Sequence, residues 1–207
     1  MKKIFISIII CFTLIIQTSN CFASNFEFKA FVSRDWGGDA SSRNAASYMV
    51  NIYQKLGYRN SNGSGFVNYA SKGDVTNYLN YLGNNFGMYI CAHGGPDSIA
   101  MVNGVGSEYI YPNEMRGYWH LVFIDACSCL KTTAFADALK TTGYAKRACI
   151  GWYDTVTNVA SEEFMKHFYV TAGRSNLRQS LLDAAQLCEN YTPIRIFGDK
   201  SWNGYAF

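Results

Sequence analysis

The 207-residue chain has few charged side chains, 16% of the total, and no run of basic residues. The lack of a basic run argues against nucleic-acid binding. After residue 23 every apolar run has the length of a strand, so no further membrane span is expected. The sequence also lacks internal repeats, low-complexity linkers and any segment that marks a calcium loop. What remains is one globular domain with a core of ordinary size.

The first 23 residues have the pattern of a secretory signal peptide. Lys2 and Lys3 precede an apolar run over residues 4–16, which is short for a bilayer span, and residues 21–23 suit a signal peptidase. We expect cleavage after Ala23, which leaves a secreted, periplasmic or cell-surface domain of residues 24–207. An uncleaved membrane anchor and a lipoprotein attached through Cys21 are the alternatives.

Five cysteines remain after the predicted cleavage. An odd number in a secreted protein indicates a free thiol or an intermolecular bond, and a nucleophilic cysteine would account for the odd one. The sequence leaves the pairing of the others open. The five are Cys91, Cys127, Cys129, Cys149 and Cys188.

Two apolar segments end in residues that carry chemistry. Leu121–Ile124 has the composition of a buried strand and is followed by Asp125 and, two residues later, Cys127. Met88–Ala92 is a similar segment and leads directly into His93. If the two strands are parallel neighbours, the thiol and the imidazole emerge at the same edge, where α/β sheets bind their ligands. An imidazole beside a thiol can accept its proton or stabilise the thiolate.

Strand and helix patterns alternate along the rest of the chain. This alternation predicts an α/β fold, with a mainly parallel sheet covered by helices on both faces. The sequence predicts strands at 26–32, 66–69, 88–92, 98–105, 107–111, 121–124, 147–152 and 193–199, and helices at 40–56, 74–82, 132–142, 161–170 and 175–189.

His-Gly after one strand and Asp-Ala-Cys after the next resemble the motifs of the caspase-like (clan CD) cysteine peptidases. The clostripain- and gingipain-like branch is the most similar, and the resemblance extends from about residue 28 to the C-terminus. It implies a three-layer sandwich that cleaves polypeptides without a cofactor. Cys127 would be the nucleophile and His93 the acid and base, while the backbone N–H groups of Gly94 and Cys127 would hold the oxyanion.

Asp125 is the candidate for substrate specificity. Alternate residues of a strand face the same side, so Asp125 is expected to share a cleft with Cys127. The resemblance implies that this position lines the pocket for the residue before the scissile bond, and a carboxylate there implies Arg or Lys. Asp35, Asp154 and Trp152 are further candidates for the same pocket. Asp125 is alternatively a structural acceptor of hydrogen bonds, and Trp152 alternatively a core aromatic.

Other interpretations of these residues stay open at this point. Cys129 is a second candidate nucleophile. Cys91-x-His93 and Cys127-x-Cys129 contain four zinc-ligand types, although structural zinc sites usually have wider spacing within each pair. The same fold could also serve as a non-catalytic binding module, or as a transpeptidase or ligase that passes the acyl group to an amine.

Overall fold

The computed structural model describes residues 26–33, 38–61, 63, 65–81, 86–102, 106–189 and 193–206. Its central seven-stranded sheet has the order β10-β9-β8-β4-β1-β2, with β3 also paired to β1. All the pairs are parallel except that of β10 with β9. The strands are β1 (Glu27–Ser33), β2 (Arg59–Asn60), β3 (Val67–Ala70), β4 (Gly87–Cys91), β8 (Leu121–Asp125), β9 (Ala148–Trp152) and β10 (Ile194–Gly198).

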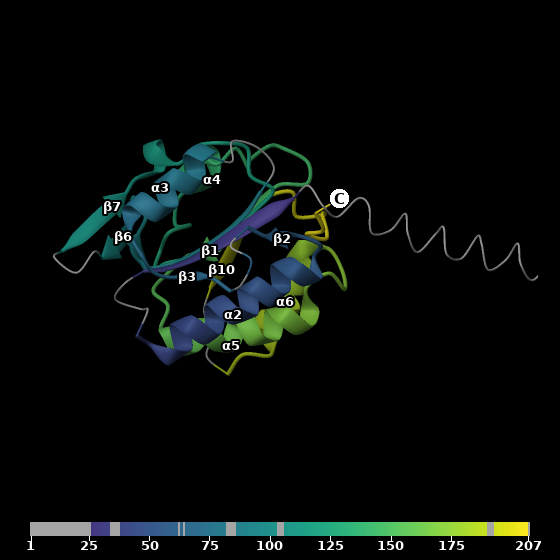
Figure 1. Cartoon of the computed structure of the whole chain (residues 1–207). Coiled ribbons are helices and arrows are strands. Elements are labelled where there is room, and N and C mark those ends of the chain that lie inside the picture. The colour runs from purple at the N-terminus through teal and green to yellow at the C-terminus, as the bar shows by residue number, and fades with distance from the viewer. Residues whose placement is uncertain are drawn as a thin grey trace, which may run out of the picture.

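Helices cover both faces of this sheet, as Figure 1 shows. One layer contains α2 (Ala40–Lys55), α5 (Asn158–Thr171) and α6 (Leu177–Gln186), and the other contains α3 (Lys72–Tyr81) and α4 (Ala134–Ala138). A second, antiparallel sheet of β5 (His93–Gly95), β6 (Ser98–Val102) and β7 (Ser107–Ile110) projects from one end, followed by the 3-10 helix η1 (Pro112–Glu114). The predicted α/β fold with a mainly parallel sheet between two helical layers is therefore confirmed.

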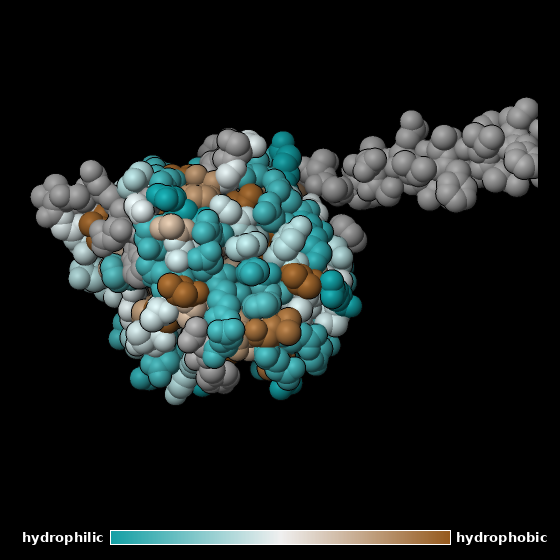
Figure 2. Space-filling model, turned by 90° about the horizontal axis from the view of Figure 1, so that it is seen from below, coloured by the Kyte–Doolittle hydropathy of each residue, from teal (hydrophilic) through white to brown (hydrophobic). Residues whose placement is uncertain are grey.

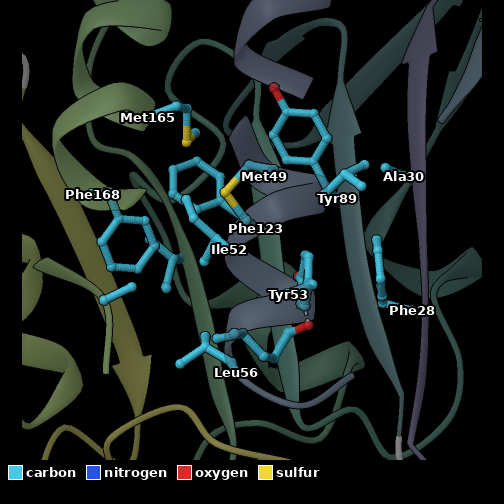
Figure 3. Close-up of a cluster of buried hydrophobic side chains, with 14 of the residues drawn as sticks. Phe28, Ala30, Met49, Ile52, Tyr53, Leu56, Tyr89, Phe123, Met165 and Phe168 are labelled. Carbon is cyan, nitrogen blue, oxygen red and sulfur yellow. Dashed lines mark hydrogen bonds between the residues drawn. The ribbon is translucent and has the colours of Figure 1, made fainter. Parts of the chain in front are cut away.

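The side chains of the central strands alternate between two cores. Tyr89 and Phe123 face the α2 and α5 layer, whereas their neighbours Met88 and Val122 face α3 and α4. Figure 3 shows the first core, where aromatic rings and methionines from the sheet and both helices interdigitate. Tyr53 is fully buried there, and its hydroxyl donates to the carbonyl groups of Met88 and Leu121 at 2.7 and 2.9 Å. The outer surface of this side is mostly hydrophilic, with separate hydrophobic residues (Figure 2).

Helix α5 begins earlier than the sequence suggested. The run of Ser161 and two glutamates resembles a helix start, but the N-cap is Thr157, whose hydroxyl accepts a hydrogen bond from the N–H of Ala160 at 3.2 Å. The prediction of a start at Ser161 is therefore wrong. The extra turn moves Ser161 inside the helix, where it is buried against the sheet.

Two other helices also differ at their ends. Helix α3 starts at Lys72 because Ser71 and Asp74 exchange hydrogen bonds across its first turn, an arrangement typical of a capping box. Helix α4 ends at Ala138, well before the predicted residue 142, because Lys140 has a φ of 55° that a helix cannot continue. The expected signal peptide and Asp35 lie outside the described residues. Among the helices that are described, none is long and apolar enough to cross a membrane.

Candidate functional site

The site is built at the edge where β4 and β8 end. The two strands are parallel neighbours, with Cys91 directly opposite Asp125. The N–H of Ala92 donates to the carbonyl of Asp125 at 3.1 Å, so the pairing continues past the last strand residue. His93 and Cys127 each follow two residues after the paired positions. Register therefore brings the two motifs out of the sheet at the same height.

Gly94 fixes how closely the two motifs approach. A Cβ atom added at Gly94 would lie 2.7 Å from the Cβ of Ala126 and 3.4 Å from the carbonyl oxygen of Cys127. The first distance is below any normal contact between carbon atoms. Only a residue without a side chain allows the segment after His93 to lie against Ala126 and Cys127 in this way.

Cys127 is half-buried beside the start of α5. The N–H of Val156 lies 3.4 Å from its Sγ atom, and the thiol in turn faces the carbonyl of Val156 at 3.5 Å. Val156 comes directly before Thr157, the N-cap of α5. A backbone N–H and the positive end of a helix both stabilise a thiolate. The N–H of Val156 is thus a hydrogen-bond donor directed at the sulfur of Cys127.

The turn after Cys127 has a constrained backbone. Ser128 has a φ of 55°, which is uncommon for a residue with a side chain. Its N–H donates to the carbonyl of Asp154 at 3.0 Å, so the end of β9 holds the turn. The exposed carboxylate of Asp154 accepts from the N–H of Thr155 at 2.8 Å. In this structure Asp154 therefore supports the turn after Cys127 through its main chain.

A small cavity lies beneath Cys127. About 10 Å³ of it is open to a water molecule, which is room for one water at most. Asp125 contributes to its wall, as the alternation along the strand predicts. The full lining is Ser42, Cys91, Ala92, Asp125, Cys127, Val156, Thr157, Asn158 and Ser161.

The carboxylate of Asp125 is enclosed by hydrogen-bond donors. Asp125 is 4% exposed, and Tyr89 and Ser161 both donate hydroxyl groups to its Oδ2 atom at 2.6 Å. The indole N–H of Trp152 donates to Oδ1, also at 2.6 Å. Burial raises the pKa of Asp125, and the three donors offset part of that rise. The carboxylate thus connects β4, β9 and α5 at the cavity that Cys127 also lines.

These contacts bear on both alternatives for Asp125 and Trp152. Trp152 is a core residue, with its ring packed edge-on against Phe123 and Phe164 at 5.8 and 5.2 Å between centroids. Trp152 is not among the described residues that line the cavity, and its indole N–H instead holds the carboxylate of Asp125. Asp125 borders the expected cleft, but its oxygens already have partners. A substrate cation would have to reach the carboxylate through a cavity with room for about one water molecule.

The other cysteines lie in different environments from Cys127. Cys129 is fully buried in the core on the α3 and α4 side, where its thiol donates to the carbonyl of Ile124 at 3.1 Å. Burial raises the pKa of Cys129 to about 12. Burial also raises the pKa of Cys91, with a further increase from the neighbouring Asp125 carboxylate.

Two of the four zinc-ligand candidates are thus kept apart by the sheet. Cys127 borders the cavity on one face, and Cys129 points into the core of the other face. No three His, Cys, Asp or Glu side chains within the described part of the chain are grouped so that they could hold a metal ion. The geometry therefore gives no support to a zinc site formed by these pairs.

The structure also brings in residues that the sequence did not single out. Asp39, the N-cap of α2, accepts hydrogen bonds at its Oδ2 atom from the N–H and hydroxyl of Ser42 and from the side-chain amide of Asn158. Because Ser42 and Asn158 line the cavity, this bridge connects the starts of α2 and α5 at its rim. The capping role of Asp39 has a sequence signal, but its link to residue 158 depends on tertiary packing.

Comparison with models of protein families and with curated proteins finds no match. Among solved structures, the chain is similar to the crystal structure of protein GSU0716 from Geobacter sulfurreducens, a structural-genomics target. The TM-score is 0.47 at 12% sequence identity, over 83% of this chain and 92% of that chain. The class of the protein is set by its own architecture, an α/β domain with a mainly parallel sheet.

Proposed function

We propose that this chain is a cysteine endopeptidase in which Cys127 and His93 form the catalytic pair. The observation that carries the proposal is the approach of two motifs, with Gly94 packed against Ala126 and Cys127 where two parallel strands end together. A half-buried thiol that accepts a hydrogen bond from a backbone N–H at a helix start supports the choice of nucleophile.

The reaction follows from these positions. The thiolate of Cys127 attacks the carbonyl carbon of a peptide bond, and the developing oxyanion is held by the N–H groups of Gly94 and Cys127. His93 protonates the leaving amine as the C–N bond breaks, which leaves an acyl group on Sγ. Water, deprotonated by His93, then attacks the thioester, releases the acid and restores the thiol. An amine in place of that water would give ligation from the same intermediate.

We further propose that the residue before the scissile bond is Arg or Lys. Asp125 supports this choice because it is an acidic residue bordering the cavity next to Cys127. The enclosure of Asp125 sets a condition. The cavity has room for about one water molecule, so a guanidinium or ammonium group reaches the carboxylate only if the cavity wall opens, and Ser161 on α5 is the donor that also lines the cavity. Substrate binding then requires a small outward movement at the start of α5.

A mixture of peptides tests the reaction, with and without prior alkylation of the thiol. We expect cleavage after Arg and Lys, and its complete loss after alkylation. No cleavage of any peptide by a folded protein would contradict the proposal.

Matched peptides that differ only in the residue before the cleaved bond test the pocket, together with the variant Asp125→Asn. The variant should lose about one to two decades in kcat/KM for Arg peptides, the effect of one charge-assisted hydrogen bond of about 1.5–3 kcal/mol. An equal loss for all peptides would make Asp125 a purely structural residue.

A further inference from the structure

A groove that shares no lining residue with the cavity beneath Cys127 runs between α6 and β10. Its volume is about 490 Å³, and its lining consists of Arg178, Leu181, Leu182, Ile194, Arg195, Ile196, Phe197 and Lys200. The middle of this lining is apolar, from three residues of β10 and two leucines of α6. Leu182 is 43% exposed, so the groove presents apolar surface to its occupant.

The strand beside the groove has an open edge. Among the described strands, β10 pairs only with β9. The bonds from Tyr153 N–H to the carbonyl of Pro193 and from Asp199 N–H to the carbonyl of Arg147 show which residues of β10 direct their backbone groups toward β9. In an antiparallel ladder the facing residues alternate. The N–H and C=O groups of Ile194 and Ile196 consequently point away from β9, and no described residue bonds to them. Such an edge is a template for one more strand.

Three cations surround this edge without carboxylate partners. Arg178, Arg195 and Lys200 line the groove, and none of them forms an ion pair with a described residue. The guanidinium of Arg195 is held in place by the ring of Tyr153, 3.9 Å from its centroid, and by a bond to the carbonyl of Lys131. No acidic side chain from the described part of the chain contributes to the lining. The groove therefore combines positive charge, apolar surface and unused backbone groups.

We propose that this groove binds an extended acidic segment of another polypeptide, which adds to the sheet as a strand next to β10. Its backbone would bond to Ile194 and Ile196, its apolar side chains would cover Leu182 and the isoleucines, and its carboxylates would pair with the cations. A second copy of this chain is a poorer occupant. Two-fold pairing of β10 with itself would bring the same three cations of both copies to one seam, and like charges oppose association.

Fluorescence anisotropy tests the proposal on the full-length Cys127→Ala variant, so that no peptide is cleaved. The probes are ten-residue peptides with alternating valine and glutamate, a matched set with lysine for glutamate, and two isomers of the acidic peptide that are N-methylated at alternate positions. We expect the acidic peptide to bind at least tenfold more tightly than the basic one. One methylated isomer should bind normally and the other should not, because only one set of peptide amides faces β10.

The double substitution Arg178→Glu and Lys200→Glu supplies the protein control. Both positions are exposed, so the fold should be retained, and the acidic peptide should lose at least tenfold in affinity. Equal binding of acidic and basic peptides would overturn the charge assignment, and equal binding of the two methylated isomers would overturn strand addition. Sedimentation of the free protein covers the remaining case. A dimer that disappears in a variant with Ile196→Pro would replace the proposed peptide by a second copy.

Discussion

Replacement of Gly94 by alanine tests the geometry on which the catalytic proposal depends. The new Cβ would lie 2.7 Å from the Cβ of Ala126, whereas carbon atoms pack at about 3.5–4.0 Å. One of the two segments must therefore move by about 1 Å, and such overpacking costs about 1–3 kcal/mol of stability. Because both segments carry the proposed catalytic groups, a shift of this size should lower kcat/KM roughly 100-fold. The loss of activity should thus greatly exceed what partial unfolding explains.

The assay is peptide cleavage under conditions where thermal melting shows the variant to be folded, together with the rate of Cys127 labelling by an electrophilic peptide. Gly95→Ala is the matched control, since its added Cβ would have no atom within 4 Å. The double variant Gly94→Ala with Ala126→Gly lacks the opposing methyl group. Its activity should therefore be close to that of the single variant Ala126→Gly. Normal activity in Gly94→Ala, an equal loss in Gly95→Ala, or no recovery in the double variant would refute the reasoning.

Three further substitutions test the remaining assignments. Cys127→Ala should abolish both peptide cleavage and labelling by the electrophilic peptide, whereas Cys129→Ala should preserve them. Full activity in a folded Cys127→Ala variant would contradict the assignment of Cys127 as the nucleophile. His93→Ala should lower kcat by about 100- to 10,000-fold, the usual contribution of acid–base catalysis, and His167→Ala should not, so equal losses in steady-state assays would contradict the choice of base. Ser161→Ala should increase the preference for Arg peptides over matched neutral ones, because it removes a competing donor; an unchanged ratio of kcat/KM values would count against displacement of that hydroxyl.

The parts of the fold that follow from apolar patterns could be predicted from the sequence. The strand runs of β4 and β8 are continuous and buried, so both strands could be predicted, whereas their pairing as parallel neighbours was a condition of the argument. The antiparallel direction of β10 could not be predicted, since a strand of this length carries no signal for its orientation. Strand β5 was also missed. His93-Gly94-Gly95 has no strand pattern, and pairing with residues 98–100 of β6 imposes the conformation.

Predictions about the site were most accurate where the chemistry follows the strand ends. Alternation along β8 correctly placed Asp125 beside Cys127 at one cavity. The residues that enclose Asp125 could not be found in this way, because Tyr89, Trp152 and Ser161 come from three elements that meet only in the folded protein. Ser161 was misinterpreted as a helix start, since a serine before two glutamates fits that pattern equally well.

The burial of the cysteines has a practical consequence for measuring this protein. Burial raises the pKa of Cys91, Cys129 and Cys149, and that of the half-buried Cys188 is raised to about 11, also mainly by burial. At neutral pH these four thiols should react slowly with an alkylating reagent in the folded chain, leaving Cys127 as the fast site among the cysteines that the structure describes. Uptake of one equivalent before denaturation, compared with the total uptake afterwards, then counts the chains in a preparation whose Cys127 is intact and accessible. That count needs no knowledge of the natural substrate.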